Sequence, residues 1–268
     1  MTLRNRITVS VARITALLTV IAILLVLASI AGQLIFHLTT HDTAFGMIRL
    51  FNVDTENNVP TYFSALLLLT SALLIGIIAV LERRDSSDFF YWIGLSAGFV
   101  LMAADEALSF HEKLISPVQN LLAWERLGIF YFAWIVPGII LVLLLGLVFL
   151  RFWWRLPPAT RFNFLVAGLF YLGGAIGIEA FGGWYAETFG GDLLYSMIAT
   201  LEESLEMTGS ILFIRALLLF IAEQYREVEF QITGGKEMAF ASIREGAQSK
   251  TAAQQTVWQT SLKKEGHG

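Results

Sequence analysis

The sequence predicts an all-α polytopic membrane protein, a bundle of six transmembrane helices followed by a polar C-terminal tail. Of its 268 residues, 56% are hydrophobic and only 15% are charged, whereas soluble domains carry about 25% charged residues. The mean hydropathy is +0.66. Six separate apolar runs are long enough to cross a hydrocarbon core about 30 Å thick. Together these observations exclude an ordinary soluble domain.

Each apolar run should be an α-helix, because the hydrocarbon offers no water to satisfy backbone groups. After about Glu229 the sequence becomes polar and loses any sustained apolar pattern, which is typical of a disordered or weakly helical tail. We therefore expect a transmembrane domain over residues 1–229 and a cytoplasmic tail over residues 230–268. The predicted spans are Ile14–His37, Tyr62–Leu81, Phe89–Phe110, Leu127–Phe152, Phe162–Trp184 and Leu193–Ala222.

The basic residues near the ends of the spans predict the orientation, because cytoplasmic loops are enriched in Lys and Arg. The N-terminus and every second connection carry two or three arginines each, while the opposite connections are mostly acidic. This pattern predicts that the protein lies in a lipid bilayer with both termini in the cytoplasm. The basic positions on the predicted cytoplasmic side are Arg4, Arg6, Arg13, Arg83, Arg84, Arg151, Arg155 and Arg161.

The overall charge and the missing residue types exclude several functions. The net charge is −4, so no basic surface predicts nucleic acid as a partner. Cysteine is absent, which excludes thiolate metal sites and a cysteine nucleophile. Phosphate-binding glycine loops and the GxSxG and HExxH motifs are missing as well.

The third predicted span ends in an unusual concentration of ionisable residues, in the stretch MAADEALSFHEKL. Asp105 and Glu106 fall near the outer boundary of the membrane, and His111 and Glu112 fall at or just past it. Asp105 and Glu112 are seven positions apart, so they share a face if the helix continues. Charged groups within spans are costly and usually functional.

A second acidic group lies in the sixth span, in LEESLEMTGS, where Glu202 and Glu206 share a helix face and Glu203 flanks them. Glu179 lies toward the outer end of the fifth span. The first span ends with His37, His41 and Asp42. All these groups reach a similar depth on the outer side, although the chain folds back between them. This coincidence predicts one shared pocket of carboxylates and histidine.

The acids need protons, basic partners or a bound cation to remain in such a place, and the few basic residues nearby favour protons or metal. We expect a divalent metal ion held by Asp105, His111, Glu202 and Glu206, with Asp105 and Glu206 also catalytic. Carboxylates suit Mg²⁺, Ca²⁺, Mn²⁺ or iron, and Zn²⁺ fits if the histidines converge. Supporting roles are expected for Glu106, Glu112, Glu179 and Glu203.

Two pairs of small residues predict close helix contacts. Gly94 and Gly98 lie on the third span, and Gly173 and Gly177 on the fifth. Such spacing lets helix backbones approach, which would place these two spans inside the bundle.

The chain resembles an uncharacterised bacterial family of multi-pass membrane proteins. The resemblance is carried by VPTYFSALLLL (Val59–Leu69), DEALSFHEKL (Asp105–Leu114) and LEESLEMTGSILF (Leu201–Phe213). These match, in turn, the Pro-Thr-aromatic-Ser entry to a span, the DEA…HE segment and the EE.LEM.G segment of that family. The resemblance implies a location in the bacterial inner membrane. It covers much of the membrane portion and implies importance for the acids and histidine in these segments. It implies no particular chemistry.

Three hypotheses for the function follow. In the first, the pocket binds a metal that activates water against a lipid-like substrate. In the second, the protein is a non-catalytic subunit whose acids pair with a membrane-protein partner. In the third, the acids relay protons or cations in a transporter; few polar residues continue the path toward the cytoplasm, which counts against this one.

Overall fold

The computed structural model describes residues 10–39, 46–82, 88–123, 126–225, 228–229 and 242–243. These residues form nine α-helices, a 3₁₀ turn, a π-helical turn and two short antiparallel strands. The helices are α1 (Val11–Leu38), α2 (Met47–Phe51), α3 (Val59–Leu81), α4 (Phe89–Leu108), α5 (Phe110–Leu122), α6 (Ile135–Arg155), α7 (Pro158–Leu172), α8 (Glu179–Phe189) and α9 (Leu193–Gln224); the turns are η2 (Gly128–Phe130) and η3 (Gly173–Ile178); the strands are β1 (Val228–Glu229) and β2 (Ser242–Ile243).

The chain divides into two compact units, Met1–Leu218 and Leu219–Gly268. The first unit holds α1 to α8 and most of α9. The second holds the end of α9 and the two strands. The polar cytoplasmic tail predicted after about Glu229 stays a prediction.

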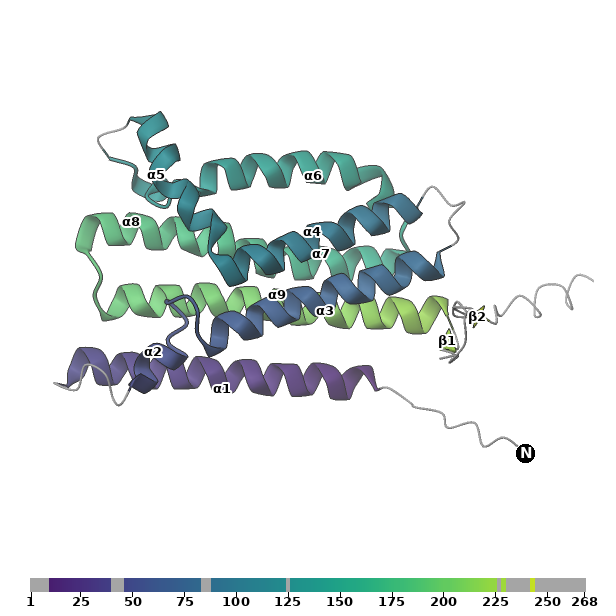
Figure 1. Cartoon of the computed structure of the whole chain (residues 1–268), viewed down its shortest axis with the longest axis horizontal. Coiled ribbons are helices and arrows are strands. Elements are labelled where there is room, and N and C mark those ends of the chain that lie inside the picture. The colour runs from purple at the N-terminus through teal and green to yellow at the C-terminus, as the bar shows by residue number, and fades with distance from the viewer. Residues whose placement is uncertain are drawn as a thin grey trace, which may run out of the picture. The chain divides into compact units, whose positions relative to one another are not determined.

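The predicted all-α membrane fold is confirmed. Within the described residues, α1, α3, α6, α9 and the continuous segment Pro158–Phe189 are long and apolar enough to cross a membrane. The helices α4 and α5 complete a sixth span only if they are taken together, because they bend by 81° at their junction. In the first unit the long helices run alongside one another (Figure 1).

The helices α3 and α9 form the centre of the bundle. Half of the apolar window of each is buried, against 17% in α1 and 11% in α6. Their shared core includes Phe63, Leu67, Met207 and Ile211, with Leu25 of α1 packed beside them. The prediction that the third and fifth spans lie inside the bundle is therefore wrong. The third span buries only Trp92 and Ala103 along α4.

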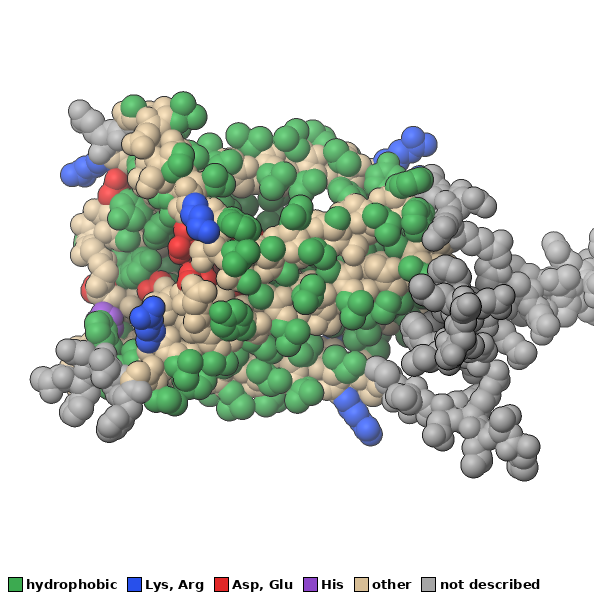
Figure 2. Space-filling view, in the orientation of Figure 1, with side chains coloured by type: hydrophobic (Ala, Val, Ile, Leu, Met, Phe, Trp, Pro, Cys, Tyr) green, Lys and Arg blue, Asp and Glu red, His purple; other side chains and the backbone are tan. Residues whose placement is uncertain are grey.

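The outer helices leave large apolar side chains exposed along their length. Leu24 is 60% exposed, Leu73 65%, Leu101 70% and Leu147 71%. Hydrophobic side chains cover much of the surface between the two ends of the long helices (Figure 2). Such continuous apolar surface is not found on soluble monomers, so these faces contact lipid.

The close helix contacts occur at glycines other than the predicted pairs. A Cβ added at Gly98, Gly173 or Gly177 would meet nothing within 4 Å. At Gly209 of α9 it would lie 2.5 Å from the backbone nitrogen of Tyr171, and at Gly174 it would lie 2.7 Å from the backbone oxygen of Glu202. These two glycines let α9 pack directly against α7 and η3.

Two spans differ from their predicted bounds for local reasons. The third ends at Leu108, because Ser109 adopts the left-handed conformation with φ 50° and turns the chain into α5. The fourth begins at Ile135 instead of Leu127. The segment before it is held as a turn, because the backbone N–H groups of Leu127 and Gly128 donate to the Glu187 carboxylate at 2.9 and 2.8 Å.

Candidate functional site

The predicted site residues that the structure describes lie toward one end of the bundle, where α1, α4 and α8 end and α3, α6 and α9 begin. We call this the acidic end; it is on the left in Figure 1. On the face drawn in Figure 2, acidic side chains gather around a recess at this end. The predicted convergence of the third, fifth and sixth spans at similar depth therefore agrees with the fold.

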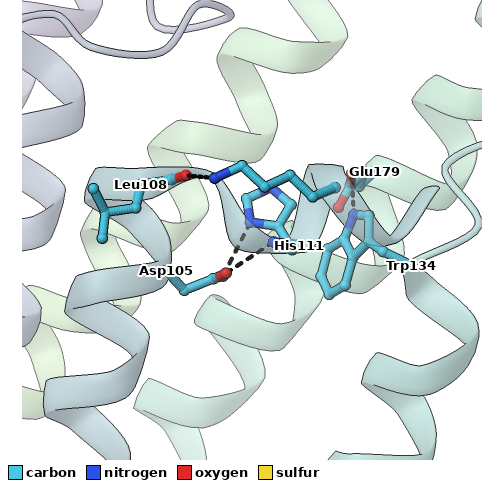
Figure 3. Close-up of polar contacts among 6 residues, drawn as sticks. Asp105, Leu108, His111, Trp134 and Glu179 are labelled. Carbon is cyan, nitrogen blue, oxygen red and sulfur yellow. Dashed lines mark hydrogen bonds and ion pairs between the residues drawn. The ribbon is translucent and has the colours of Figure 1, made fainter. Parts of the chain in front are cut away.

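Asp105 and His111 form the best-defined polar contact of the site. The backbone N–H of His111 donates to Asp105 Oδ1 at 2.9 Å, and His111 Nδ1 lies 3.0 Å from Asp105 Oδ2 (Figure 3). The left-handed turn at Ser109 brings these two side chains together, and Asp105 thereby caps the start of α5. The continuous helix face expected for Asp105 and Glu112 is interrupted by this turn.

This contact fixes the tautomer of the imidazole. When Nδ1 carries the proton that it donates to Asp105, Nε2 keeps its lone pair. A histidine oriented by a carboxylate in this way is the usual arrangement of a metal-binding histidine. Asp105 is thus placed to orient His111, a different role from the predicted one of direct ligand.

Glu179 is held beside His111 by a tryptophan. Trp134 Nε1 donates to Glu179 Oε1 at 2.7 Å, and the rings of Trp134 and His111 lie 5.0 Å apart (Figure 3). Glu179 follows η3 directly, and π-helical turns often occur at functional sites. Glu179 therefore supports the site from the N–H edge of the Trp134 ring.

The loop between α2 and α3, residues 52–58, brings a further acid to the site. Asn58 holds this loop: its amide donates to the backbone oxygens of Asn52 at 2.5 Å and Thr55 at 2.6 Å. Its carbonyl oxygen accepts from the backbone N–H of Thr61 at 3.1 Å, which caps α3. From α1, Ser29 accepts from the backbone N–H of Val53 at 3.1 Å.

Replacing Asn58 with alanine should destabilise the protein by about 1–2 kcal/mol, because the helix cap is lost together with the loop contacts. Thermal unfolding in detergent, followed by tryptophan fluorescence, measures this as a lower midpoint. Asn58→Asp is the matched control, because it keeps the capping oxygen and loses the amide donors. Its unfolding midpoint should therefore fall between those of the wild type and Asn58→Ala. An unchanged midpoint in Asn58→Ala would contradict this role.

Glu56, in this loop, is the acid that meets His111. Its side chain is hydrogen-bonded to Ser109, at the turn between α4 and α5. Its Oε2 atom is buried and has no hydrogen-bond partner among the described residues. Burial, and then repulsion from Glu112, raises the pKa of the Glu56 carboxyl. An unpaired buried oxygen of this kind would be satisfied by a proton or a cation.

Glu56, His111 and Glu112 could together hold a metal ion. One nitrogen or oxygen atom from each side chain lies within 4.8 Å of the others, and no other such group of three occurs in the described ranges. We call these three residues the metal triad. The predicted ligand His111 belongs to it, while Glu112, predicted to support the site, supplies a ligand atom.

The acids of α9 lie deeper and form a second layer. Glu203 interacts electrostatically with Glu106 and Glu56, and Glu206 with Glu203 and Glu106. Glu202 interacts with Glu179. Glu202 and Glu206 therefore lie outside the metal triad in this structure, and their roles as ligands, and that of Glu206 in catalysis, stay predictions.

The histidines of the first span have separate positions. His37 Nε2 lies 3.3 Å from the Ser196 hydroxyl of α9, so it joins two helices. His41 and Asp42 lie outside the described residues.

Sequence reasoning missed Asp54, Glu56 and Trp134. The stretch NVDTENNVP did carry a signal, because two acids occupy a loop on the same side as the acidic spans. Protein packed around the Asp54 carboxyl raises its pKa to about 6, although the side chain still meets water. Trp134 gave no signal, since aromatic residues near span ends usually serve as interface anchors.

Comparison with known proteins gives a family and no activity. Residues 16–221 match the family model described as Domain of unknown function (DUF8692). No curated protein and no solved structure matches the chain.

Proposed function

We propose that this chain, which belongs to the DUF8692 family, binds a divalent metal ion through the metal triad and acts on a lipid-like substrate at the membrane surface. The observation that carries the proposal is the triad itself: an imidazole and two carboxylates that converge within 4.8 Å, one of them with a buried unpaired oxygen.

The triad fits a metal in charge and in chemistry. Two carboxylates this close repel each other, and a divalent cation removes that repulsion. His111 is oriented by Asp105 so that Nε2 faces away from the carboxylate, as metal-binding histidines are. Three protein ligands also leave a coordination position open, which catalytic sites require.

The donor set favours a borderline transition metal. One imidazole with two carboxylates suits Zn²⁺, Fe²⁺ or Mn²⁺. Ca²⁺ takes six to eight oxygen ligands, more than the triad offers. We therefore use Zn²⁺ and Mn²⁺ as probes.

A divalent ion bound here would lower the pKa of a coordinated water and polarise a carbonyl or phosphoryl oxygen. The site lies at the ends of the spans, where the head groups and ester bonds of lipids lie. With the predicted orientation, it would open to the outer leaflet of the bacterial inner membrane. Glu106, which interacts with His111 and Glu56, is then the candidate proton acceptor.

Metal titration of the full-length protein in detergent tests the site. After treatment with EDTA and its removal, calorimetry with Zn²⁺ and with Mn²⁺ should give one site per chain. Glu56→Gln should weaken the affinity at least tenfold, because it removes one charged ligand. Glu223→Gln is the matched control: it removes an exposed acid near the end of α9 and should bind metal as the wild type does.

Lipid turnover tests the activity. The protein is incubated with mixed lipid vesicles and metal, and the lipids are analysed by mass spectrometry. A product that needs metal and is lost in Glu56→Gln supports the proposal. Metal binding without turnover would limit the proposal to the metal site. If neither metal binding nor lipid turnover is found, the hypothesis of a non-catalytic subunit of a larger membrane complex is favoured.

A further inference from the structure

A second feature of the acidic end is a pocket of about 520 Å³ beside the metal triad. It lies among the last turns of α1, the helix α2, the loop of residues 52–58 and the start of α9, and the residues that matter here are Gln33, Arg49, Asn52, Asp54 and Tyr195. Its volume is in the range of small-molecule sites. We call it the headgroup pocket, for the reasons that follow.

The pocket lies at the end of a candidate membrane span. Gln33 is within the last two turns of α1, and α2 exposes Met47 and Leu50 beside Arg49. A short helix with exposed apolar residues at a span end is suited to the boundary between hydrocarbon and water. A lipid molecule beside the bundle can therefore place its head group in the pocket without leaving the membrane.

Gln33 supplies an unused hydrogen-bond acceptor. The side chain is only 2% exposed, and its Nε2 lies 2.9 Å from Asn52 Oδ1 and 3.2 Å from the hydroxyls of Ser29 and Thr200. Its Oε1 atom is buried and has no partner among the residues that the structure describes. A buried acceptor left unpaired is costly, and Gln33 is among the residues that line the pocket.

The pocket carries both signs of charge. Arg49 and Asp54 both line it, and the described part of the chain contains no ion pair between them. Asp54 is held by a hydrogen bond from Tyr195. A guanidinium binds phosphate oxygens in a planar, two-point geometry, and a carboxylate suits an ammonium group. The complementary ligand is a zwitterion with a phosphate and a primary amine.

We propose that the headgroup pocket binds a phosphorylated primary amine of the phosphoethanolamine type, with its phosphate at Arg49 and its ammonium at Asp54. The assignment names the substrate class of the proposed function and in that respect depends on it. The connection is structural, because the loop of residues 52–58 carries Asp54 into the pocket and Glu56 into the metal triad, and Asp54 lies within electrostatic range of Glu112.

Binding can be measured on the full-length protein with the metal site kept empty. Native mass spectrometry in detergent with EDTA gives the affinity for phosphatidylethanolamine, for phosphatidylglycerol, which lacks the amine, and for phosphatidylcholine, whose quaternary amine donates no hydrogen bond. Phosphatidylethanolamine should bind at least tenfold more tightly than the other two. Competition by free phosphoethanolamine at the same concentration as the lipid would support the same chemistry and assign it to a soluble ligand.

Two substitutions test the basic and the acidic group of the pocket separately. Arg49→Gln should weaken phosphatidylethanolamine binding at least tenfold, and Asp54→Asn should abolish its preference over phosphatidylglycerol. Arg126→Gln, the matched control at the same end, lies outside the pocket lining and should bind lipid normally. Thermal unfolding confirms that each variant is folded.

Equal binding of the three lipids, unaffected by either substitution, would overturn the proposal. The failure of the metal site is distinguishable from this outcome. Arg49→Gln should keep its affinity for Zn²⁺, and Glu56→Gln should keep its affinity for phosphatidylethanolamine.

Discussion

Replacing His111 with alanine should weaken the binding of Zn²⁺ by more than about 100-fold. His111 supplies the only nitrogen ligand of the metal triad. Loss of a partner that merely orients a ligand costs 10–100-fold in metal affinity, so loss of the ligand itself should cost more. Calorimetric titration of the EDTA-treated variant measures the change.

Asp105→Asn separates orientation from coordination. The substitution leaves His111 in place but weakens the contact that keeps the proton on Nδ1. We expect a loss of about 10–100-fold in affinity, smaller than that of His111→Ala. If Asp105→Asn instead matched or exceeded His111→Ala, Asp105 would be a direct ligand, as first predicted from the sequence.

Replacing Gly209 with leucine should destabilise the bundle by about 3 kcal/mol, the largest effect on folding that we expect. A Cβ there would lie 2.5 Å from the backbone nitrogen of Tyr171 and 2.8 Å from its Cα. Backbone atoms cannot move aside as a flexible side chain can, so α7 and α9 must separate, and overpacking of this kind typically costs 1–3 kcal/mol or more. Chemical or thermal unfolding in detergent measures the loss.

Gly98→Leu is the matched control, because a Cβ at Gly98 meets nothing within 4 Å. Leucine forms helix better than glycine by up to about 1 kcal/mol, so this variant should be as stable as the wild type or slightly more so. Equal destabilisation by the two substitutions would mean that α7 and α9 do not approach closely at Gly209.

The spans could be predicted from the sequence because hydrocarbon imposes the same requirement on every residue within it. The runs beginning near Ile14, Tyr62 and Leu193 became α1, α3 and α9 with bounds that differ by a few residues. The position of the acids toward one end followed from counting residues along each helix.

The local breaks could not be predicted, because they depend on contacts between distant segments. Nothing in LSFHE marks Ser109 as a left-handed residue; its hydrogen bond to Glu56, more than fifty positions away, accompanies that turn. Likewise the late start of α6 depends on Glu187 of α8. The small-residue pairs failed for the same reason, since spacing alone does not tell which glycine faces a neighbour.

The site was predicted in part. The DEALSFHEKL segment and the acids of the fifth and sixth spans lie toward the same end of the bundle, and their roles in one site stay predictions. However, the third member of the metal triad, Glu56, lies in a loop, and the reasoning from helix faces considered only residues within the spans. The turn at Ser109 interrupts the helix face that Asp105 and Glu112 were expected to share, and it directs the Asp105 carboxylate to His111. The role of Asp105 as a direct ligand stays a prediction.

The most direct test is the anomalous X-ray scattering of zinc in crystals of the full-length protein. Our proposal predicts one strong peak at about 2.0–2.2 Å from the ligand atoms of Glu56, His111 and Glu112, with His111 Nε2 as the nitrogen ligand and Asp105 still bonded to Nδ1. A peak centred on Glu202 and Glu206, or none at the acidic end under zinc concentrations that saturate binding in solution, would contradict it.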